Sequence, residues 1–311
     1  MLKTDNHSMH HPIHLRRKSR ARTFVPRAAF FVWLLTILLA FAGIPVANGQ
    51  TQATSALAAA KADASQSKSP WERIVMVGAS ATAGFTMSEP FGGTNTAQYR
   101  LNRYVEAALL APHEPVTNLA SALFFLQPEA AGRSQIDLAL KLKPTLVVGV
   151  DFPFWFCYGD VRTNEGRVQR FEKGLRLLEN IPCRLVLGDI PDASAAANGI
   201  LSASQIPSIE VMVAANRRLK EWAAARPQVV VFPLASFMRA AMANQALTVH
   251  GNILPAGETR MLLQDDKLHP SASGCAALAV AVLDVVQSKE PAPSTAGVRW
   301  DPKEVFRQVA K

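Results

Sequence analysis

Residues 74–84 read Ile-Val-Met-Val-Gly-Ala-Ser-Ala-Thr-Ala-Gly. An apolar run without polar alternation is typical of a strand that is buried on both faces, as in a parallel sheet. The run ends abruptly at Gly78, so Ser80 is expected just past the carboxyl end of the strand. The small residues around Ser80 would let backbone and ligand come close together. This stretch therefore predicts a parallel sheet with a serine at its carboxyl edge.

From residue 71 onward, short apolar runs alternate with amphipathic segments of helical length. Strands are predicted at 73–77, 116–119, 145–150, 184–187 and 229–232, and helices at 98–110, 135–142, 168–179, 206–225, 237–246 and 273–286. Strict alternation of strand and helix indicates a parallel sheet that is covered on both sides. The expected fold class is α/β, a doubly wound, flavodoxin-like five-stranded parallel sheet with helices on both faces. Such folds bind ligands at the carboxyl ends of their strands.

The positive charge of the chain is concentrated at its start. The formal net charge is +9, and residues 1–27 hold seven Lys and Arg against one Asp, which accounts for +6. The remaining +3 is nearly balanced, so no nucleic-acid partner is expected. Residues 28–47 are uncharged and lead to the small-residue exit Ala47-Asn48-Gly49, a pattern typical of secretory signal peptides.

The apolar run is also about as long as a membrane span, so residues 1–49 are predicted to be a signal peptide or an uncleaved N-terminal anchor. Either alternative predicts an exported protein, periplasmic or extracellular, that contacts a membrane only through that segment. Residues 50–70 lack aromatic residues and are expected to be a flexible linker. Residues 71–290 form the predicted domain, and residues 291–311, which begin Pro-Ala-Pro-Ser, a loosely attached C-terminal tail.

The three cysteines allow at most one disulfide, and two interpretations stay open. Cys157 and Cys183 could form a bridge in an oxidising compartment, whereas Cys183 and Cys275 lie in apolar runs typical of small buried side chains. No Cys-x-x-Cys or His/Cys cluster has the spacing of a metal site, so neither metal nor cofactor is expected.

A second informative segment precedes the last predicted helix and reads Asp265-Asp266-Lys267-Leu268-His269-Pro270. An Asp three residues before a His can accept the imidazole Nδ1–H, which fixes the tautomer and stabilises the imidazolium. A serine hydroxyl is a poor nucleophile until a base removes its proton. We therefore expect the fold to bring Ser80 to His269, with Asp266 behind the ring. The simpler alternatives are a helix-capping serine and a histidine in a surface turn.

These segments resemble the SGNH (GDSL-type) hydrolase family. Its opening block reads Gly-Asp-Ser-x-x-x-Gly, which residues 78–84 match except at Ala79, and its closing block reads Asp-x-x-His-Pro followed by Gly, which residues 266–274 match. Residues 144–151 are similar to the strand that usually ends Gly-x-Asn-Asp, and residues 116–122 to the strand whose following loop supplies a Gly. The resemblance covers roughly residues 71–288.

The resemblance implies Ser80 as nucleophile, His269 as general base and acid, and Asp266 as the orienting carboxylate. It also implies an oxyanion hole from the backbone N–H of Ser80, the N–H of Ala122 (or Leu123 in the other alignment) and the side chain at position 151. The family has Asn at that last position, whereas this chain has Asp151.

An ionised carboxylate at position 151 would repel a developing oxyanion, and the loss of one such donor costs about 10²–10³ in rate. Asp151 could donate only if burial raised its pKa enough to keep it protonated. Its alternative role is to cap backbone N–H groups at the end of the strand. If Asp151 has no positive role, Asp151→Asn leaves activity unchanged or raises it.

Aromatic residues follow Asp151, and Phe152, Phe154 and Trp155 are the candidate substrate-binding residues. They could wall an acyl pocket or stack on a sugar, or simply pack a loop against the domain. The resemblance implies a serine esterase that hydrolyses carboxylic esters, such as polysaccharide O-acetyl or short acyl esters, through an acyl-enzyme. Its expected partner is an ester-bearing small molecule or a polysaccharide. The alternatives are a polysaccharide O-acyltransferase and a catalytically weakened binding protein of the same fold.

Overall fold

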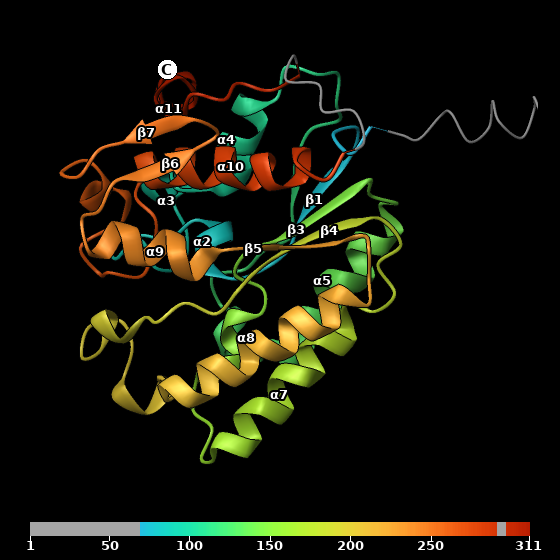
Figure 1. The fold of residues 1–311 in the computed structure, drawn as a ribbon, viewed down its shortest axis with the longest axis vertical. Helices are drawn as coiled ribbons and strands as arrows, with labels where there is room; N and C mark the ends of the chain where they lie inside the picture. The colour runs from blue at the N-terminus through green and yellow to red at the C-terminus, as the bar shows by residue number, and fades with distance from the viewer. Residues whose placement is uncertain (1–68, 291–296) are drawn as a thin grey trace, which may run out of the picture. The chain divides into compact units, whose positions relative to one another are not determined.

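The computed structural model describes residues 69–290 and 297–311. A five-stranded sheet in the order β2-β1-β3-β4-β5 runs through them (Figure 1). The strands are β1 (Ile74–Met76), β2 (Thr117–Asn118), β3 (Leu146–Gly149), β4 (Arg184–Gly188) and β5 (Val229–Phe232). Every neighbouring pair is parallel. The predicted flavodoxin-like α/β fold is therefore confirmed.

Each face of the sheet buries alternate residues of the same strands. Ile74 and Met76 pack into one hydrophobic core, whereas Val75 and Val77 pack into the other, and all four side chains are fully buried. Successive side chains of a strand point to opposite faces, and here both faces are covered. This is why the strands read as continuous apolar runs.

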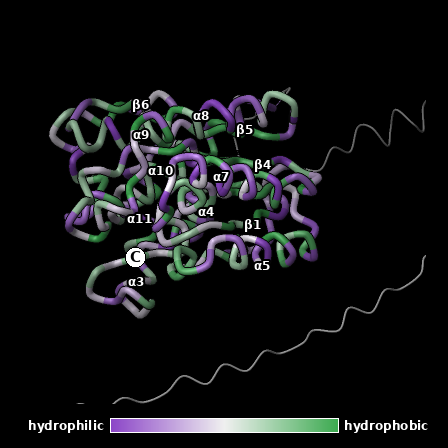
Figure 2. The backbone as a smooth tube through the Cα atoms, turned by 90° about the horizontal axis from the view of Figure 1, so that it is seen from below, coloured by the Kyte–Doolittle hydropathy of each residue, from purple (hydrophilic) through white to green (hydrophobic). Residues whose placement is uncertain are grey.

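Two layers of helices cover the sheet. On one side are α4 (Leu101–Ala108), α9 (Leu234–Met242), α10 (Ala272–Gln287) and α11 (Pro302–Val309), and on the other α5 (Pro128–Lys141), α7 (Asn164–Leu177) and α8 (Ile209–Ala224). Figure 2 shows hydrophilic stretches along α7 and α8, as expected for helices with one solvent face. The Ala/Val-rich α10 is buried along most of its length.

The predicted helices exist, but several begin earlier than expected. α5 begins at Pro128, whose ring suits the first turn of a helix, and α7 begins after Thr163, whose side chain accepts a hydrogen bond from Gly166 N–H. Short elements escaped the sequence analysis because each spans about one turn or a few residues. They are α2 (Ser80–Ala83), α3 (Thr94–Ala97), α6 (Phe154–Cys157), the hairpin β6–β7 (Leu247–Val249 and Asn252–Leu254) and four 3₁₀ turns, η1 (Phe124–Leu126), η2 (Ser194–Ala196), η3 (Ala203–Gln205) and η4 (Thr259–Leu262).

The C-terminal residues 297–311 are not loosely attached, which corrects that part of the prediction. α11 packs against α4 and α10, and Val298 and Val305 are buried in the core on that side. The N–H of Arg299 donates to the carbonyl of Ala108 over 2.6 Å. The apolar residues of this segment have the spacing of one short amphipathic helix. The Pro-rich start of the segment led to the prediction of a loose tail instead.

The predicted signal peptide or anchor (1–49) and residues 50–68 of the predicted linker lie outside the described residues. Within the part of the chain that the structure describes, no helix combines the length and apolar character needed to cross a bilayer. Cys157, Cys183 and Cys275 are free thiols, so the bridge between Cys157 and Cys183 is not formed. Cys157 and Cys275 are buried and Cys183 is half-buried.

Candidate active site

Ser80 is the first residue of α2, directly beyond the carboxyl end of β1. The turn between them depends on Gly78, whose φ of +142° is rarely adopted by residues with a side chain. A Cβ at this position would lie 2.1 Å from Oδ1 of Asp151. The motif glycine therefore permits both the turn and the close approach of β3.

Ser80, His269 and Asp266 form one hydrogen-bonded chain. Ser80 Oγ lies 2.8 Å from His269 Nε2, and His269 Nδ1 lies 2.7 Å from Asp266 Oδ2. The side chains of His269 and Asp266 are only 3% and 5% exposed. The fold thus brings together the serine and the histidine that the sequence places 189 residues apart.

Asp266 is held by the backbone of its own turn. Its Oδ1 accepts hydrogen bonds from the N–H groups of Leu268 and His269, at 3.0 and 2.9 Å. Burial by itself would raise the pKa of Asp266, but the hydrogen bond and the charge of His269, together with those two N–H groups, outweigh it and lower the pKa. The carboxylate is therefore kept ionised beside the imidazole.

Two residues that no motif indicated support His269, one by contact with its ring and one through the backbone next to it. The ring of Phe85 stacks on that of His269 with their centroids 4.1 Å apart. Gln264 Nε2 donates to the carbonyls of Phe85 and Pro270, at 2.8 and 2.9 Å. The sequence does not indicate them, because a Phe or a Gln is recognised as part of a catalytic site only when its contacts are known.

Asp151 lies beneath the α2 turn and acts there as an acceptor, which differs from the donor role that the resemblance implies. Its Oδ1 accepts from Ala79 N–H (3.0 Å) and from Thr82 Oγ1–H (2.6 Å), and its Oδ2 accepts from Thr82 N–H (3.1 Å). Burial raises the pKa of Asp151, while the hydrogen bonds from Thr82 and Ala79 partly oppose the rise. The sequence alternative of a carboxylate that caps backbone N–H groups matches this geometry.

This capping explains the departure of the opening motif. Ala79 is the N-cap of α2 and has no side-chain acceptor, although the third N–H of a helix is the usual target of an N-cap carboxylate. Here that N–H belongs to Thr82, and Asp151 binds it from the neighbouring strand β3. The carboxylate that binds this N–H therefore comes from position 151 and not from the N-cap position 79.

In the described part of the chain, two backbone N–H groups of residues that line the pocket at Ser80 make no hydrogen bond of their own. Among the described residues, the N–H groups of Ser80 and Ala122 have no hydrogen-bond acceptor. Ser80 and Ala122 line the same pocket as His269, whereas the N–H of Leu123 already donates to Ser121 Oγ. This favours Ala122 over Leu123 as the counterpart of the family's loop residue.

Gln135 and Asn118 fix the two loops that carry these N–H groups, and sequence reasoning missed both. Gln135, buried on α5, pairs with the Gly78 peptide through Oε1 to N–H (2.7 Å) and Nε2 to the carbonyl (3.0 Å). Asn118 donates to the carbonyl of Thr82 and accepts from the N–H of Ala120, both at 3.0 Å. The sequence indicates them only by placing a polar residue on a side of the helix or strand that is otherwise apolar.

The three candidate substrate-binding aromatics divide between two environments. Phe154 and Trp155, at the start of α6, line a pocket with Ser80. Phe152 does not, because it is fully buried against Phe124 and Phe156, so its predicted role in binding substrate is wrong. The indole N–H of Trp155 has no hydrogen-bond partner among the described residues.

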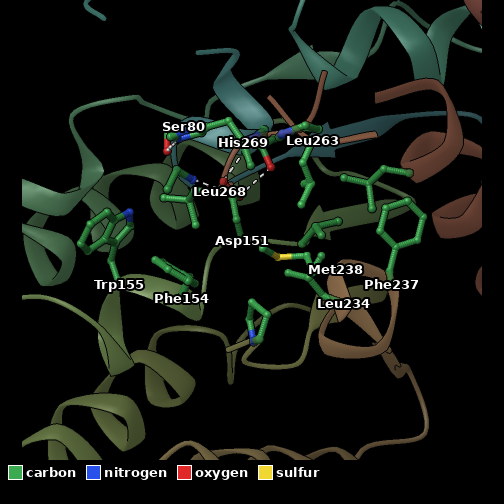
Figure 3. Close-up of a pocket in the computed structure, with 17 residues that line it drawn as sticks. Ser80, Asp151, Phe154, Trp155, Leu234, Phe237, Met238, Leu263, Leu268 and His269 are labelled. Atoms are coloured by element: carbon green, nitrogen blue, oxygen red, sulfur yellow. Dashed lines mark hydrogen bonds between the residues drawn. The ribbon is translucent and has the colours of Figure 1, made fainter. Parts of the chain in front are cut away.

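Two pockets meet at Ser80, Trp155, Leu268 and His269. The inner pocket extends between β3, α9 and α10, and the outer pocket lies between the α2–α3 segment, the loop after β2 and residues 200–205. In Figure 3 Asp151 lies between Trp155 and Phe154 on one side and Leu263, Phe237 and Met238 on the other. Within the described part of the chain, no group of three or more His, Cys, Asp or Glu is arranged to hold a metal.

No protein-family model and no curated protein matches the chain. Among solved structures, it is similar to the lipase/acylhydrolase from Enterococcus faecalis (20% identity over 72% of this chain and 100% of that one, TM-score 0.48). It is also similar to TesA (17%, 70% and 100%, 0.40) and to LAE5, an alpha/beta hydrolase enzyme from the metagenome of Lake Arreo, Spain (16%, 70% and 96%, 0.39). None of these similarities assigns an activity to the chain.

Proposed function

We propose that this chain is a serine esterase of SGNH type, which hydrolyses carboxylic esters through an acyl-enzyme. The observation that carries the proposal is the buried chain of hydrogen bonds from Ser80 Oγ through both nitrogens of His269 to Asp266. Such a chain activates a serine, because the base that takes its proton is oriented and its positive charge is stabilised.

The reaction follows from these contacts. With Nδ1–H donated to Asp266, His269 Nε2 takes the proton of Ser80 as Oγ attacks the ester carbonyl carbon. The oxygen that becomes negative accepts hydrogen bonds from the N–H groups of Ser80 and Ala122. His269 then returns the proton to the leaving alkoxide, and the acyl group stays on Oγ. A water activated by the same nitrogen releases the acid and restores the serine.

Asp151 is assigned a positioning role in this reaction. Its hydrogen bonds to Ala79 and Thr82 anchor the turn on which both Oγ and the N–H of Ser80 are mounted. An acceptor beneath the turn does not have to face the oxyanion. The Asp at this position is therefore compatible with catalysis.

Labelling with a fluorophosphonate probe tests the nucleophile. We expect the wild type to be labelled and Ser80→Ala not to be, while the matched control Ser88→Ala, an exposed serine outside the site, is labelled like the wild type. Ser80→Ala should also lower the kcat for p-nitrophenyl esters by about 10⁴-fold or more. A wild type that is not labelled at any pH tried would instead support the binding-protein alternative.

The oxyanion role of Ala122 needs its own variant, because a backbone N–H is removed only by proline. Ala122→Pro should lower kcat by about 10²–10³. Ala122→Gly keeps the N–H and should stay within a few-fold of the wild type. Equal losses in both variants would show that the loop, and not its N–H, matters.

Export of the chain is a further part of the proposal and rests on residues 1–49, with their basic start, apolar core and small-residue exit. N-terminal sequencing of the protein recovered outside the cytoplasm would separate the two alternatives. A new N-terminus near Gly49 supports a cleaved signal peptide, and an intact N-terminus in the membrane fraction supports an anchor. Recovery of the full chain in the cytoplasm alone would contradict export.

A further inference from the structure

The apolar lining of the site points to its substrate class. We infer that the acyl part of the substrate is a linear hydrocarbon chain of several carbons, bound in the inner pocket, and not an acetyl group carried by a polysaccharide. The inference rests on the proposed esterase function and adds to it which end of the ester binds where.

The inner pocket beyond Ser80 is built from hydrocarbon side chains of several separate elements. They come from the end of β3, from α9, from the segment before α10 and from α10 itself: Val150, Leu234, Phe237, Met238, Leu263 and Leu278. All except the half-buried Leu263 are buried.

The polar side chains of the inner pocket are already engaged with each other. Ser80 is bound to His269, and Thr82 to Asp151, which leaves the Trp155 indole N–H as the unpartnered side-chain donor. A sugar placed there would lose the hydrogen bonds of its hydroxyls to water without replacement, whereas a hydrocarbon chain would lose none. The backbone N–H groups of Ser80 and Ala122 remain for the ester carbonyl, and the hydrocarbon part of the acyl group needs no donor.

The outer pocket is also apolar but is open at its rim. Met87 and Phe91 are 62% and 82% exposed there, and Phe125 is 40% exposed. During the reaction the alcohol must leave while the acyl group remains covalently attached to Ser80. The inner pocket, whose lining is mostly buried, therefore suits the acyl chain. The outer pocket, whose rim is exposed, suits the departing alcohol and the incoming water.

Burial of a hydrocarbon chain sets the size of the expected effect. Each methylene transferred from water into an apolar pocket should raise kcat/KM about four-fold until the pocket is full. An acetyl ester makes none of these contacts, so it should be a poor substrate. The chain-length profile of kcat/KM is accordingly the property to measure.

The experiment uses p-nitrophenyl acetate, butyrate, hexanoate, octanoate and decanoate, which share one leaving group. We expect kcat/KM of the wild type to rise from acetate to a maximum at a longer chain. Met238→Trp, which fills the inner pocket, should lower the ratio of octanoate to acetate at least ten-fold, and Met238→Ala should move the maximum to longer chains. Phe125→Ala, in the outer pocket, should leave that ratio within two-fold of the wild type.

The outcomes separate this inference from the proposed function. Labelling of Ser80 with a profile that is flat or highest for acetate overturns the inference and keeps the esterase. A shift of the profile by Phe125→Ala and not by the Met238 variants overturns the placement of the acyl chain. If Ser80 is not labelled and no ester is hydrolysed, the proposed function itself is overturned. Thermal unfolding of each variant shows whether it is folded. If Met238→Trp does not fold, the chain-length profile of Met238→Ala tests the placement of the acyl chain.

Discussion

Two carboxylates serve the same site from different regions of the molecule, and their environments are opposite. Asp266, in the loop before α10, binds His269 and the backbone of its own turn, and its pKa is lowered. Asp151, at the end of β3, accepts only from the neutral donors of the α2 turn, and burial raises its pKa. Around Asp266 the contact with His269 and two N–H groups outweighs the effect of burial on the pKa, whereas the neutral donors around Asp151 only reduce that effect.

The two carboxylates also differ in how far along the sequence their hydrogen-bond partners lie. The partners of Asp266 are within three residues of it, so its spacing to His269 in the sequence already indicates the contact. The partners of Asp151 are about seventy residues away, so its residue type alone suggests an impaired oxyanion hole. In the folded protein Asp151 instead caps the N–H groups of the α2 turn.

The largest effect is expected from the local pair. Asp266→Asn removes the acceptor that holds the His269 tautomer, and kcat should fall by about 10³- to 10⁴-fold. The neighbouring Asp265 is exposed and serves as the matched control, since Asp265→Asn should leave kcat unchanged. Comparable losses in both variants would mean that the turn as a whole, and not the Nδ1 contact, supports the histidine.

A smaller loss is expected from Asp151→Asn, contrary to the sequence-based expectation of unchanged or raised activity. An amide has one acceptor oxygen, so its NH₂ group would face the N–H of either Ala79 or Thr82 and leave that donor unsatisfied. Displacement of the α2 turn should lower kcat about 10- to 100-fold. Steady-state kinetics together with thermal unfolding measure the effect.

The double variant Ala79→Asp/Asp151→Asn sharpens this comparison. It returns the carboxylate to the N-cap position of α2, where it can reach Thr82 N–H. We expect the double variant to recover at least part of the activity lost in Asp151→Asn, with a coupling measured by the double-mutant cycle. Additive losses would count against the exchange of the carboxylate between the two positions.

The third effect concerns the glycine that lets the two regions meet. Gly78→Ala puts a Cβ 2.1 Å from Asp151 Oδ1 at a φ of +142°, so the free energy of unfolding should fall by about 2 kcal/mol or more. Gly251→Ala is the control, because its φ is also positive (+78°) but its Cβ would meet nothing within 4 Å. Urea unfolding should therefore show the smaller loss for Gly251→Ala.

The smallest effect is the dependence of stability on pH. The pKa of Asp266 is lowered on folding, so its stabilisation is present above the ordinary Asp pKa and is lost as the pH falls through the folded value. The pKa of Asp151 is raised, so its contribution is most favourable below the ordinary value and is lost as the pH rises through the folded value.

Unfolding free energies of the wild type, Asp266→Asn and Asp151→Asn from about pH 3 to pH 7 would measure both contributions. The difference between the wild type and Asp266→Asn should shrink in acid below the ordinary Asp pKa. The difference between the wild type and Asp151→Asn should instead grow in favour of the wild type as the pH falls. The same slope for both variants would contradict the opposite environments of the two carboxylates.

The sequence alone determined the parallel sheet, its five strands and the spacing of Asp266 to His269. These follow from apolar runs and short-range turns, whose physical causes lie within a few consecutive residues. The sequence does not show that Phe152 belongs to the core, that α11 is docked, or that Gln135, Asn118, Phe85 and Gln264 support the site, because these depend on contacts between distant segments. Above all, the tertiary structure decided that Asp151 is an acceptor beneath α2, because a carboxylate takes its protonation and its role from burial and from donors that only folding brings to it.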